Sequence, residues 1–305
     1  MKLSDSTAER ISLICEAAVR QGSLVPVREV LELLPEEATA DELAQAISAS
    51  PLSSLMELKE GYLAPLSWSD SRTLDEAGNR RAALENLRHA RRFERSLHNT
   101  PFRVVAVSGS TSYGSASRSK DLDLFCIAKS GRMWSTLAKG LLIARAYRLL
   151  HRDSPSLCFS CVMDESYADS VFSLREDPLF ARDALRAEVL RGATEYEGLL
   201  GKARWIAEFY PLAYAKRMKA GPTPPGGVRS SGGPPLVEAV ARLFLSRFIF
   251  TKSKFLNRRI SREGREGDGF GVKSGSGHLI YESDRYRELR GEYIAAIAPA
   301  RAPAQ

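Results

Sequence analysis

The chain has 305 residues and a net charge of +7, with hydrophobic and charged fractions of 44% and 27%. These values are ordinary for a globular protein, and the length is enough for a large core spread over two or three domains. Charged residues interrupt the apolar runs before any of them is long enough to span a bilayer, and the first ten residues lack the apolar core of a signal peptide. We therefore expect a cytoplasmic protein with no membrane partner.

Residues 1–70 are predicted to form three helices followed by a β-hairpin. Pro26 begins the second helix, at 27–34, and Thr39 is a suitable N-cap for a third helix that extends to Ser48. Two short apolar runs on either side of Gly61 give the hairpin. This order resembles a winged-helix domain, a module that often binds DNA through a recognition helix. Here that helix is acidic and has no Lys or Arg, so packing or dimerisation is an equal alternative.

The connecting segment 71–101 is predicted to be a long basic helix over 75–98. Ala83, Leu87, Ala90 and Leu97 recur at helical spacing and form an apolar stripe. Six arginines cover much of the remaining surface (Arg80, Arg81, Arg88, Arg91, Arg92 and Arg95). Most of them are expected to be solvated, with a few available to phosphate.

The segment 104–127 carries the strongest functional signal. A β-type apolar run at 104–107 leads into the small-residue turn Ser108, Gly109 and Ser110. Glycine lets a ligand approach the backbone closely, and a helix that starts at Ser110 would present free N–H groups to phosphate. Ser119 and Lys120, which come just before two acids, are further candidates for phosphate contact.

Asp121 and Asp123 follow this turn and are separated by one leucine. Residues two apart in a strand point to the same face, so the two carboxylates are predicted to lie side by side. Their mutual repulsion is relieved by a bound cation, and hard ions such as Mg²⁺ take one or two carboxylates together with substrate phosphate oxygens. The sequence therefore predicts that Asp121 and Asp123 bind Mg²⁺ or Mn²⁺.

The turn and the acid pair together resemble the signature of the DNA polymerase β-like nucleotidyltransferase superfamily. Its pattern is an apolar residue, Gly and then Gly or Ser, about ten residues, and an acid–apolar–acid–apolar run. Ser108 stands where the pattern has the apolar residue, and the other elements match. The resemblance implies that residues 102–211 form a nucleotidyltransferase domain in which two divalent ions are held by Asp121 and Asp123. It also implies a third acid on a later strand.

That third acid has no clear counterpart. The next predicted strand, 157–163, has Ser160 at its centre, and Asp164 follows at its end, where it is equally suited to a turn. Cys158 and Cys161 are predicted to point to opposite faces of this strand and to be structural cysteines. Arg132 is a candidate phosphate contact, and a salt bridge at the start of a helix is the alternative. The chain from 179 to 211 is predicted to be helical, with a break near Gly192.

Over residues 25–211 the chain also resembles prokaryotic nucleotidyltransferase-domain proteins that have a winged-helix-like front end. The matching stretches are EGYLAPL, the arginine-rich helix, GSTSYGSASRSKDLDLF with KSGRMW, and KARWIAEFYP. We therefore expect an α+β protein: a winged-helix-like domain, then a mixed sheet of the nucleotidyltransferase fold flanked by helices, then a helical C-terminal region.

The remaining sequence is basic. Residues 212–235 are rich in Pro and Gly and are predicted to be a linker, and 236–305 a basic region with helices at 236–257 and 284–297. The glycine-rich stretch 263–277 is predicted to be a mobile loop. Between 211 and 265 there are twelve Lys or Arg and two Glu. Such a segment favours a nucleic-acid partner, and a solvated basic face is the equal alternative.

These observations lead to two functional hypotheses. The first is a metal-dependent nucleotidyltransferase that moves a nucleoside monophosphate from an NTP such as ATP to a hydroxyl acceptor and releases pyrophosphate. The second is a non-catalytic regulator on the same fold that binds nucleotide or nucleic acid, including an antitoxin-like role. In the first, Asp121, Asp123 and Asp164 are the catalytic candidates, and Gly109, Ser110, Ser119, Lys120 and Arg132 are the phosphate candidates.

Overall fold

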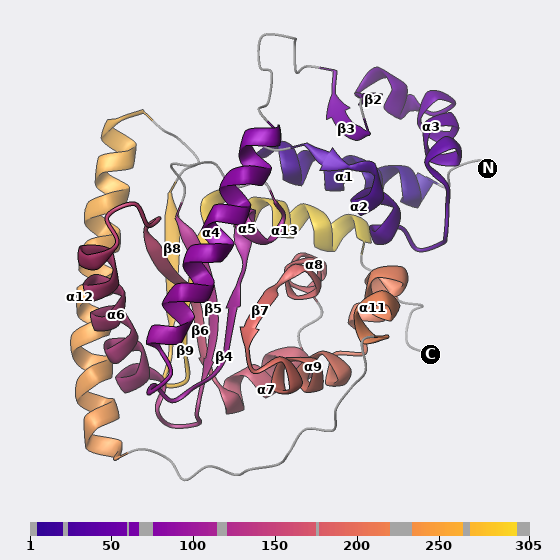
Figure 1. Ribbon diagram of the computed structural model, residues 1–305. Helices are drawn as coiled ribbons and strands as arrows, with labels where there is room; N and C mark the ends of the chain where they lie inside the picture. The colour runs from indigo at the N-terminus through magenta and orange to yellow at the C-terminus, as the bar shows by residue number, and fades with distance from the viewer. Residues whose placement is uncertain are drawn as a thin grey trace.

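The computed structural model describes residues 5–20, 24–59, 61–66, 76–114, 121–174, 177–219, 234–264 and 269–297. Within these ranges the protein is a mixed α+β structure with a three-stranded sheet near the N-terminus and a six-stranded sheet at its centre (Figure 1). No helix of the described ranges is both long and apolar enough to cross a membrane.

The N-terminal unit contains three helices and three short strands. They are α1 (Asp5–Arg20), β1 (Val25–Pro26), α2 (Val27–Leu33), α3 (Ala40–Ser48), the 3-10 turn η1 (Pro51–Ser54), β2 (Met56–Lys59) and β3 (Tyr62–Pro65). The strands pair in the antiparallel order β1-β3-β2. The predicted cap of α3 is confirmed, because the Glu42 amide donates to the Thr39 hydroxyl (3.2 Å) and the Thr39 amide donates to the Glu42 carboxylate (2.8 Å).

The central sheet has the strand order β7-β4-β5-β6-β9-β8. Its members are β4 (Phe102–Val107), β5 (Leu122–Ala128), β6 (Leu157–Asp164), β7 (Glu188–Arg191), β8 (Phe270–Ser274) and β9 (His278–Ser283). Strands β5 and β6 are parallel and are joined through α6 (Met133–Leu150), while the other neighbours are antiparallel. A segment from near the C-terminus therefore extends the sheet beyond β6.

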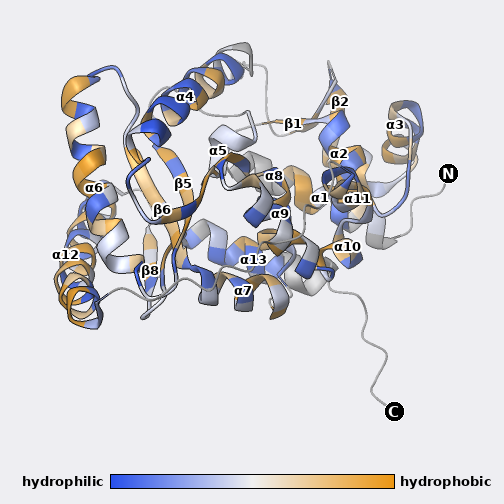
Figure 2. Cartoon of the chain, turned by 60° about the horizontal axis from the view of Figure 1, so that its bottom comes forward, coloured by the Kyte–Doolittle hydropathy of each residue, from blue (hydrophilic) through white to orange (hydrophobic). Residues whose placement is uncertain are grey.

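The side chains of β5 alternate between two apolar clusters, one on each face of the sheet. Leu122, Leu124 and Cys126 pack with α4 (Glu76–Ser96), α6 and α12 (Pro235–Arg262). Phe125 and Ile127 pack with α7 (Glu165–Leu174), α8 (Pro178–Arg186) and α9 (Ala193–Lys202). Figure 2 shows the strands between these two helical layers. This alternation also determines the face to which Asp123 points.

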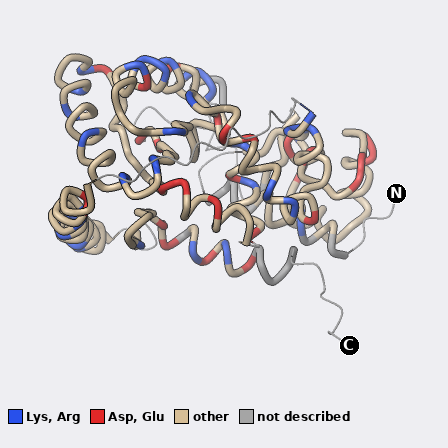
Figure 3. The backbone as a smooth tube through the Cα atoms, turned by 90° about the horizontal axis from the view of Figure 1, so that it is seen from below, with Lys and Arg blue, Asp and Glu red and all other residues tan. Residues whose placement is uncertain are grey.

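The helical layer of α4, α6 and α12 is basic. Exposed Lys and Arg side chains recur along α4, α6 and α12, as Figure 3 shows on that side of the sheet. The exposed face of α12 also carries large apolar side chains, among them Phe244 (70% exposed) and Phe248 (62%). The acidic α3 lies on the opposite side of the molecule (Figure 3).

The N-terminal unit packs directly on the larger part of the chain. Helix α1 lies against α13 (Asp284–Ile297), and α2 lies against α11 (Pro211–Met218). One apolar cluster extends from Ile11 and Val30 in this unit to Phe172 in α7 and to Ile206, the first residue of α10 (Ile206–Phe209). The two parts therefore share a buried core.

Three predictions of secondary structure are wrong, wholly or in part. Strand β7 occupies 188–191, inside a stretch predicted to be helical, because β4 offers an unpaired edge whose amides and carbonyls need partners. Strands β8 and β9 form a hairpin inside the predicted loop 263–277 and beyond it, so the C-terminal region is not wholly helical. The predicted linker 212–235 is wrong at its start, because residues 212–218 belong to α11, and residues 220–233 lie outside the described residues.

Candidate functional site

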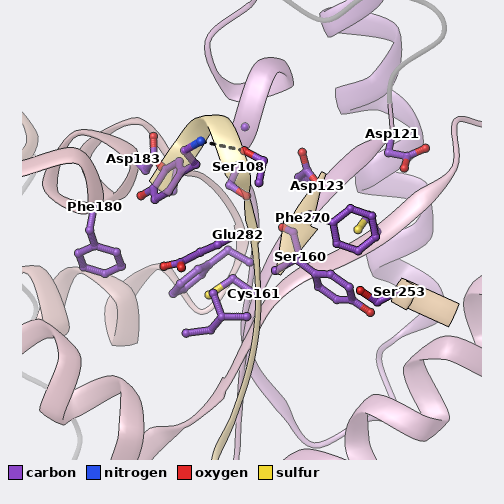
Figure 4. Close-up of a pocket in the computed structure, with 18 of the residues that line it drawn as sticks. Ser108, Asp121, Asp123, Ser160, Cys161, Phe180, Asp183, Ser253, Phe270 and Glu282 are labelled. Atoms are coloured by element: carbon purple, nitrogen blue, oxygen red, sulfur yellow. Dashed lines mark hydrogen bonds between the residues drawn. The ribbon is translucent and has the colours of Figure 1, made fainter. Parts of the chain in front are cut away.

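A pocket of about 480 Å³ lies at the end of the central sheet where β4 ends and β5 begins. Residues of the β4–α5 turn, β5 and β6 line its floor, and α8, β8, β9, α12 and α13 supply its walls. Figure 4 shows Asp123 near the centre, with Asp183 and Phe180 on one side and Phe270 and Ser253 on the other. The volume is within the range of small-molecule sites.

The turn after β4 is built around Gly109, which begins the short helix α5 (Gly109–Ser112) one residue before the predicted start. Gly109 has φ of +63°, and a Cβ at this position would lie 2.6 Å from Asp123 Oδ2. The turn is fixed by the Ser108 amide, which donates to the Asp123 carbonyl (3.0 Å), and by Asn86, whose amide nitrogen donates to the Thr111 hydroxyl (3.2 Å). Gly109 therefore permits the close contact between the turn and the Asp123 carboxylate.

We expect Gly109→Ala to destabilise the protein by about 1–3 kcal/mol, because it combines a strained backbone with a steric clash against Asp123. Thermal unfolding measures this loss. Gly264→Ala is the matched control, since Gly264 has φ of +66° but no heavy atom within 4 Å of its Cβ position. Equal losses in the two variants would show that the contact with Asp123 carries no cost.

Asp121 and Asp123 both line the pocket, as expected for residues two apart at the start of a strand. Burial, together with the charge of Asp121, raises the pKa of Asp123 to about 7, and hydrogen bonds from Cys158 and Ser160 act in the opposite direction. Asp121 is exposed and Asp123 is partly buried, and two neighbouring carboxylates that repel each other suit a divalent cation, which prefers hard oxygen ligands. Among the described residues, no set of three or more His, Cys, Asp or Glu side chains is grouped as a metal site.

Strand β6 departs from regular pairing beside these acids. Asp123 pairs with Cys158 and Phe125 pairs with Cys161, so β6 contains one additional residue between the two pairs. As a result Cys158 and Cys161 both line the pocket, while Phe159 packs in the cluster on the opposite face. The prediction that the two cysteines face opposite sides is wrong because of this bulge. Burial raises the pKa of the Cys158 thiol, which therefore stays protonated and donates to Asp123.

Two further carboxylates, which the sequence did not indicate, also line the pocket. Asp183, on α8, accepts a hydrogen bond from the Tyr113 hydroxyl (2.5 Å), and burial raises its pKa. Glu282, on β9, forms ion pairs with Lys273 (2.6 Å) and Arg290 (2.7 Å). Both acids reach the pocket through contacts between elements distant in sequence, so no local pattern marks them.

The structure does not bring Asp164 or Arg132 to the pocket. Asp164 pairs with Ala128 at the other end of β6, about 20 Å along the strand from Cys158. There it accepts a hydrogen bond from the Tyr167 amide (2.9 Å) at the start of α7. Arg132 precedes α6 at the same end of the sheet. Of the other predicted phosphate contacts, Ser110 lies in α5 next to Gly109, and residues 119 and 120 lie outside the described residues.

Comparison of the chain with protein-family models, with curated proteins and with solved structures finds no match.

Proposed function

We propose that this protein is a metal-dependent nucleotidyltransferase that transfers a nucleoside monophosphate from an NTP to a hydroxyl acceptor. One observation carries the proposal: the Gly109 turn and the acid pair of Asp121 and Asp123 meet in one pocket, with Gly109 against the Asp123 carboxylate. Local sequence pattern alone does not require that contact. The strand–turn–helix–strand order from β4 to β5 supports the same reading.

In the proposed reaction, the acceptor oxygen forms a bond to the α-phosphorus, and the bond from that phosphorus to the bridging oxygen of pyrophosphate breaks. Gly109 leaves the turn backbone open to the phosphates, and Asp121 and Asp123 hold the cation. When bound, Mg²⁺ or Mn²⁺ supplies positive charge that offsets the charge on the triphosphate and on the leaving pyrophosphate.

The hydroxyl proton needs an acceptor, and we assign that role to Asp183 in place of Asp164. Ser160 lines the pocket and hydrogen-bonds Asp123, but it has no carboxylate and cannot serve as the base. Glu282 is already paired with Lys273 and Arg290. Asp183 lies in the pocket, and burial raises its pKa, which makes its carboxylate a stronger proton acceptor than an exposed Asp.

Activity is tested with labelled NTPs, Mg²⁺ or Mn²⁺, and mixed RNA and protein acceptors. We expect label transfer by the wild-type protein and its loss in Asp121→Asn, by at least about a hundredfold, because the charge that holds the cation is halved. Asp153→Asn is the control, since Asp153 is 79% exposed and lies outside the pocket. Absence of both transfer and Mg²⁺-dependent nucleotide binding in the wild-type protein would refute the proposal.

A second candidate function is a regulator that binds nucleotide or nucleic acid without turnover. It is favoured by the order α1-β1-α2-α3-β2-β3, which fits a winged-helix-like unit, and by the exposed Lys and Arg of α4, α6 and α12. Helix α3 has no Lys or Arg, so we assign the contact with nucleic acid to the basic helical layer. Nucleotide binding without label transfer, together with salt-dependent RNA or DNA binding, would favour this function.

A further inference from the structure

One wall of the pocket is aromatic and comes from the last part of the chain. Phe270 begins β8 and Tyr281 lies on the paired strand β9, with their ring centroids 5.9 Å apart and their planes inclined at 49°. Both residues line the pocket. In Figure 4 the Phe270 ring lies on the side of Asp123 that faces away from Asp183.

The Phe270 ring does not belong to the protein core. It is half-buried and is absent from both apolar clusters, whereas Tyr281 packs at the edge of the cluster beneath α12. A large aromatic ring that lines a cavity without packing in a core offers a face to a ligand. Phe270 is therefore better explained by the pocket than by the packing of the hairpin.

The backbone of Phe270 is held in place from two sides. The Asn257 side chain on α12 donates to the Phe270 carbonyl (2.7 Å) and accepts from the Phe270 amide (3.2 Å). The Asp284 amide donates to the carbonyl of the preceding residue, Gly269 (2.8 Å). Because the backbone that carries the ring is already held, it needs little ordering when a ligand binds, which favours affinity.

The surroundings of Phe270 indicate the chemistry of that ligand. Lys252 is the one cation among the described residues that line the pocket, and the buried Ser253 lies next to it on α12. An aromatic face with a neighbouring cation suits a flat aromatic ring that carries negative charge at one end. A nucleotide has this form, and its phosphates would lie toward Gly109 and Asp123.

We infer that Phe270 and Tyr281 form a nucleobase subsite, so that the C-terminal segment supplies the wall on which the base of the bound nucleotide stacks. This inference rests on the proposed function, because it assigns the phosphates to the Gly109 turn and the acid pair. Stacking is tolerant of base identity, so the subsite distinguishes nucleotides from bare polyphosphates more strongly than it distinguishes one base from another.

Calorimetric titration in Mg²⁺ with two probes tests the subsite: α,β-methylene-ATP, which cannot be turned over, and inorganic tripolyphosphate, which has no base. We expect Phe270→Ala to weaken binding of the nucleotide by about five- to one-hundredfold and to leave tripolyphosphate binding unchanged. Phe270→Trp should retain nucleotide affinity, because it keeps a stacking surface. Phe244→Ala, on the solvent side of α12, is the control for removing an aromatic ring outside the pocket.

The outcomes separate this inference from the proposed function. If the wild-type protein binds neither probe, the proposed function fails. If it binds both probes and Phe270→Ala leaves the nucleotide affinity unchanged, or weakens both probes equally, the base subsite is refuted and the proposed function stands. Phe270→Leu decides the question if Phe270→Ala does not fold, because it keeps an apolar side chain and removes the stacking face.

Discussion

Asp123→Asn is expected to unfold at a temperature several degrees above the wild-type protein at pH 8 in the absence of divalent cations. Burial and the charge of Asp121 raise the pKa of Asp123 from 3.8 to about 7. Above pH 7 this carboxylate is therefore ionised in both states, and its ionisation costs more free energy in the folded protein than in the unfolded chain. A pKa change of this size corresponds to about 4 kcal/mol of lost stability. Asparagine has a similar shape and removes this cost.

The sign of the effect also determines its pH dependence. Below about pH 4 both folded and unfolded chains have Asp123 protonated, so the advantage of Asp123→Asn should disappear there. Between pH 4 and 7 the wild-type protein loses stability relative to the variant as pH rises, and above pH 7 the difference is constant. Thermal unfolding at half-unit pH intervals measures this profile, with the exposed Asp153→Asn as control.

Divalent cations should reverse the ranking. A cation that binds the folded wild-type protein stabilises it by mass action, and Asp123→Asn should gain little because it lacks one of the two charges. We therefore expect Mg²⁺ to raise the melting temperature of the wild-type protein more than that of the variant. An Asp123→Asn protein that is less stable than wild type at pH 8 without cation would show that the carboxylate makes a net favourable contact.

The sequence predicts those parts of the site whose geometry depends on residues close together in the chain. The shared face of Asp121 and Asp123 follows from the two-residue period of a strand, and the turn at Gly109 follows from local backbone freedom. Asp183 and Phe270 reach the same pocket from α8 and β8, through packing that no local pattern records. The local half of the pocket was therefore predictable and the walls were not.

The errors in the predicted secondary structure also arise from contacts between residues that are distant in sequence. The residues of β7, Glu-Val-Leu-Arg, directly follow a run of good helix formers, and pairing with the free edge of β4 makes them a strand. The bulge between Cys158 and Cys161 reverses the side-chain alternation of β6, and nothing in the sequence marks the additional residue. The helices α4 and α13 were predicted to within two residues at each end.

The second large effect is expected from Glu29, an acid of α2 that is buried in the contact between the N-terminal unit and α8. Its carboxylate pairs with Arg182 (3.4 Å) and Arg186 (3.5 Å), and the Arg182 side chain is only 2% exposed. Removing one partner of a buried ion pair weakens the compensation of the remaining charge, which costs about 3–5 kcal/mol. We therefore expect Glu29→Gln to lower the free energy of unfolding by about this amount in urea titrations.

Two further variants separate the buried charge from packing. Glu32→Gln removes a more exposed acid that also pairs with Arg186, so its effect should be below about 1 kcal/mol. Glu29→Leu combined with Arg182→Met removes both charges and should recover most of the stability, because apolar replacements of a buried pair are often neutral. A double variant as unstable as Glu29→Gln would assign the loss to shape rather than to charge.

Loss of the Glu29 carboxylate should also disturb the position of Asp183 in the pocket, because Arg182 contacts both Glu29 and Tyr113. The Arg182 guanidinium lies 4.7 Å from the centre of the Tyr113 ring, and the Tyr113 hydroxyl donates to Asp183. A displaced Arg182 leaves Tyr113 without this contact, and Asp183 with a less fixed hydrogen-bond donor. We expect Glu29→Gln to lower label transfer more than nucleotide binding, since Asp183 is assigned to proton uptake. Equal losses of both, measured well below the melting temperature, would contradict that link.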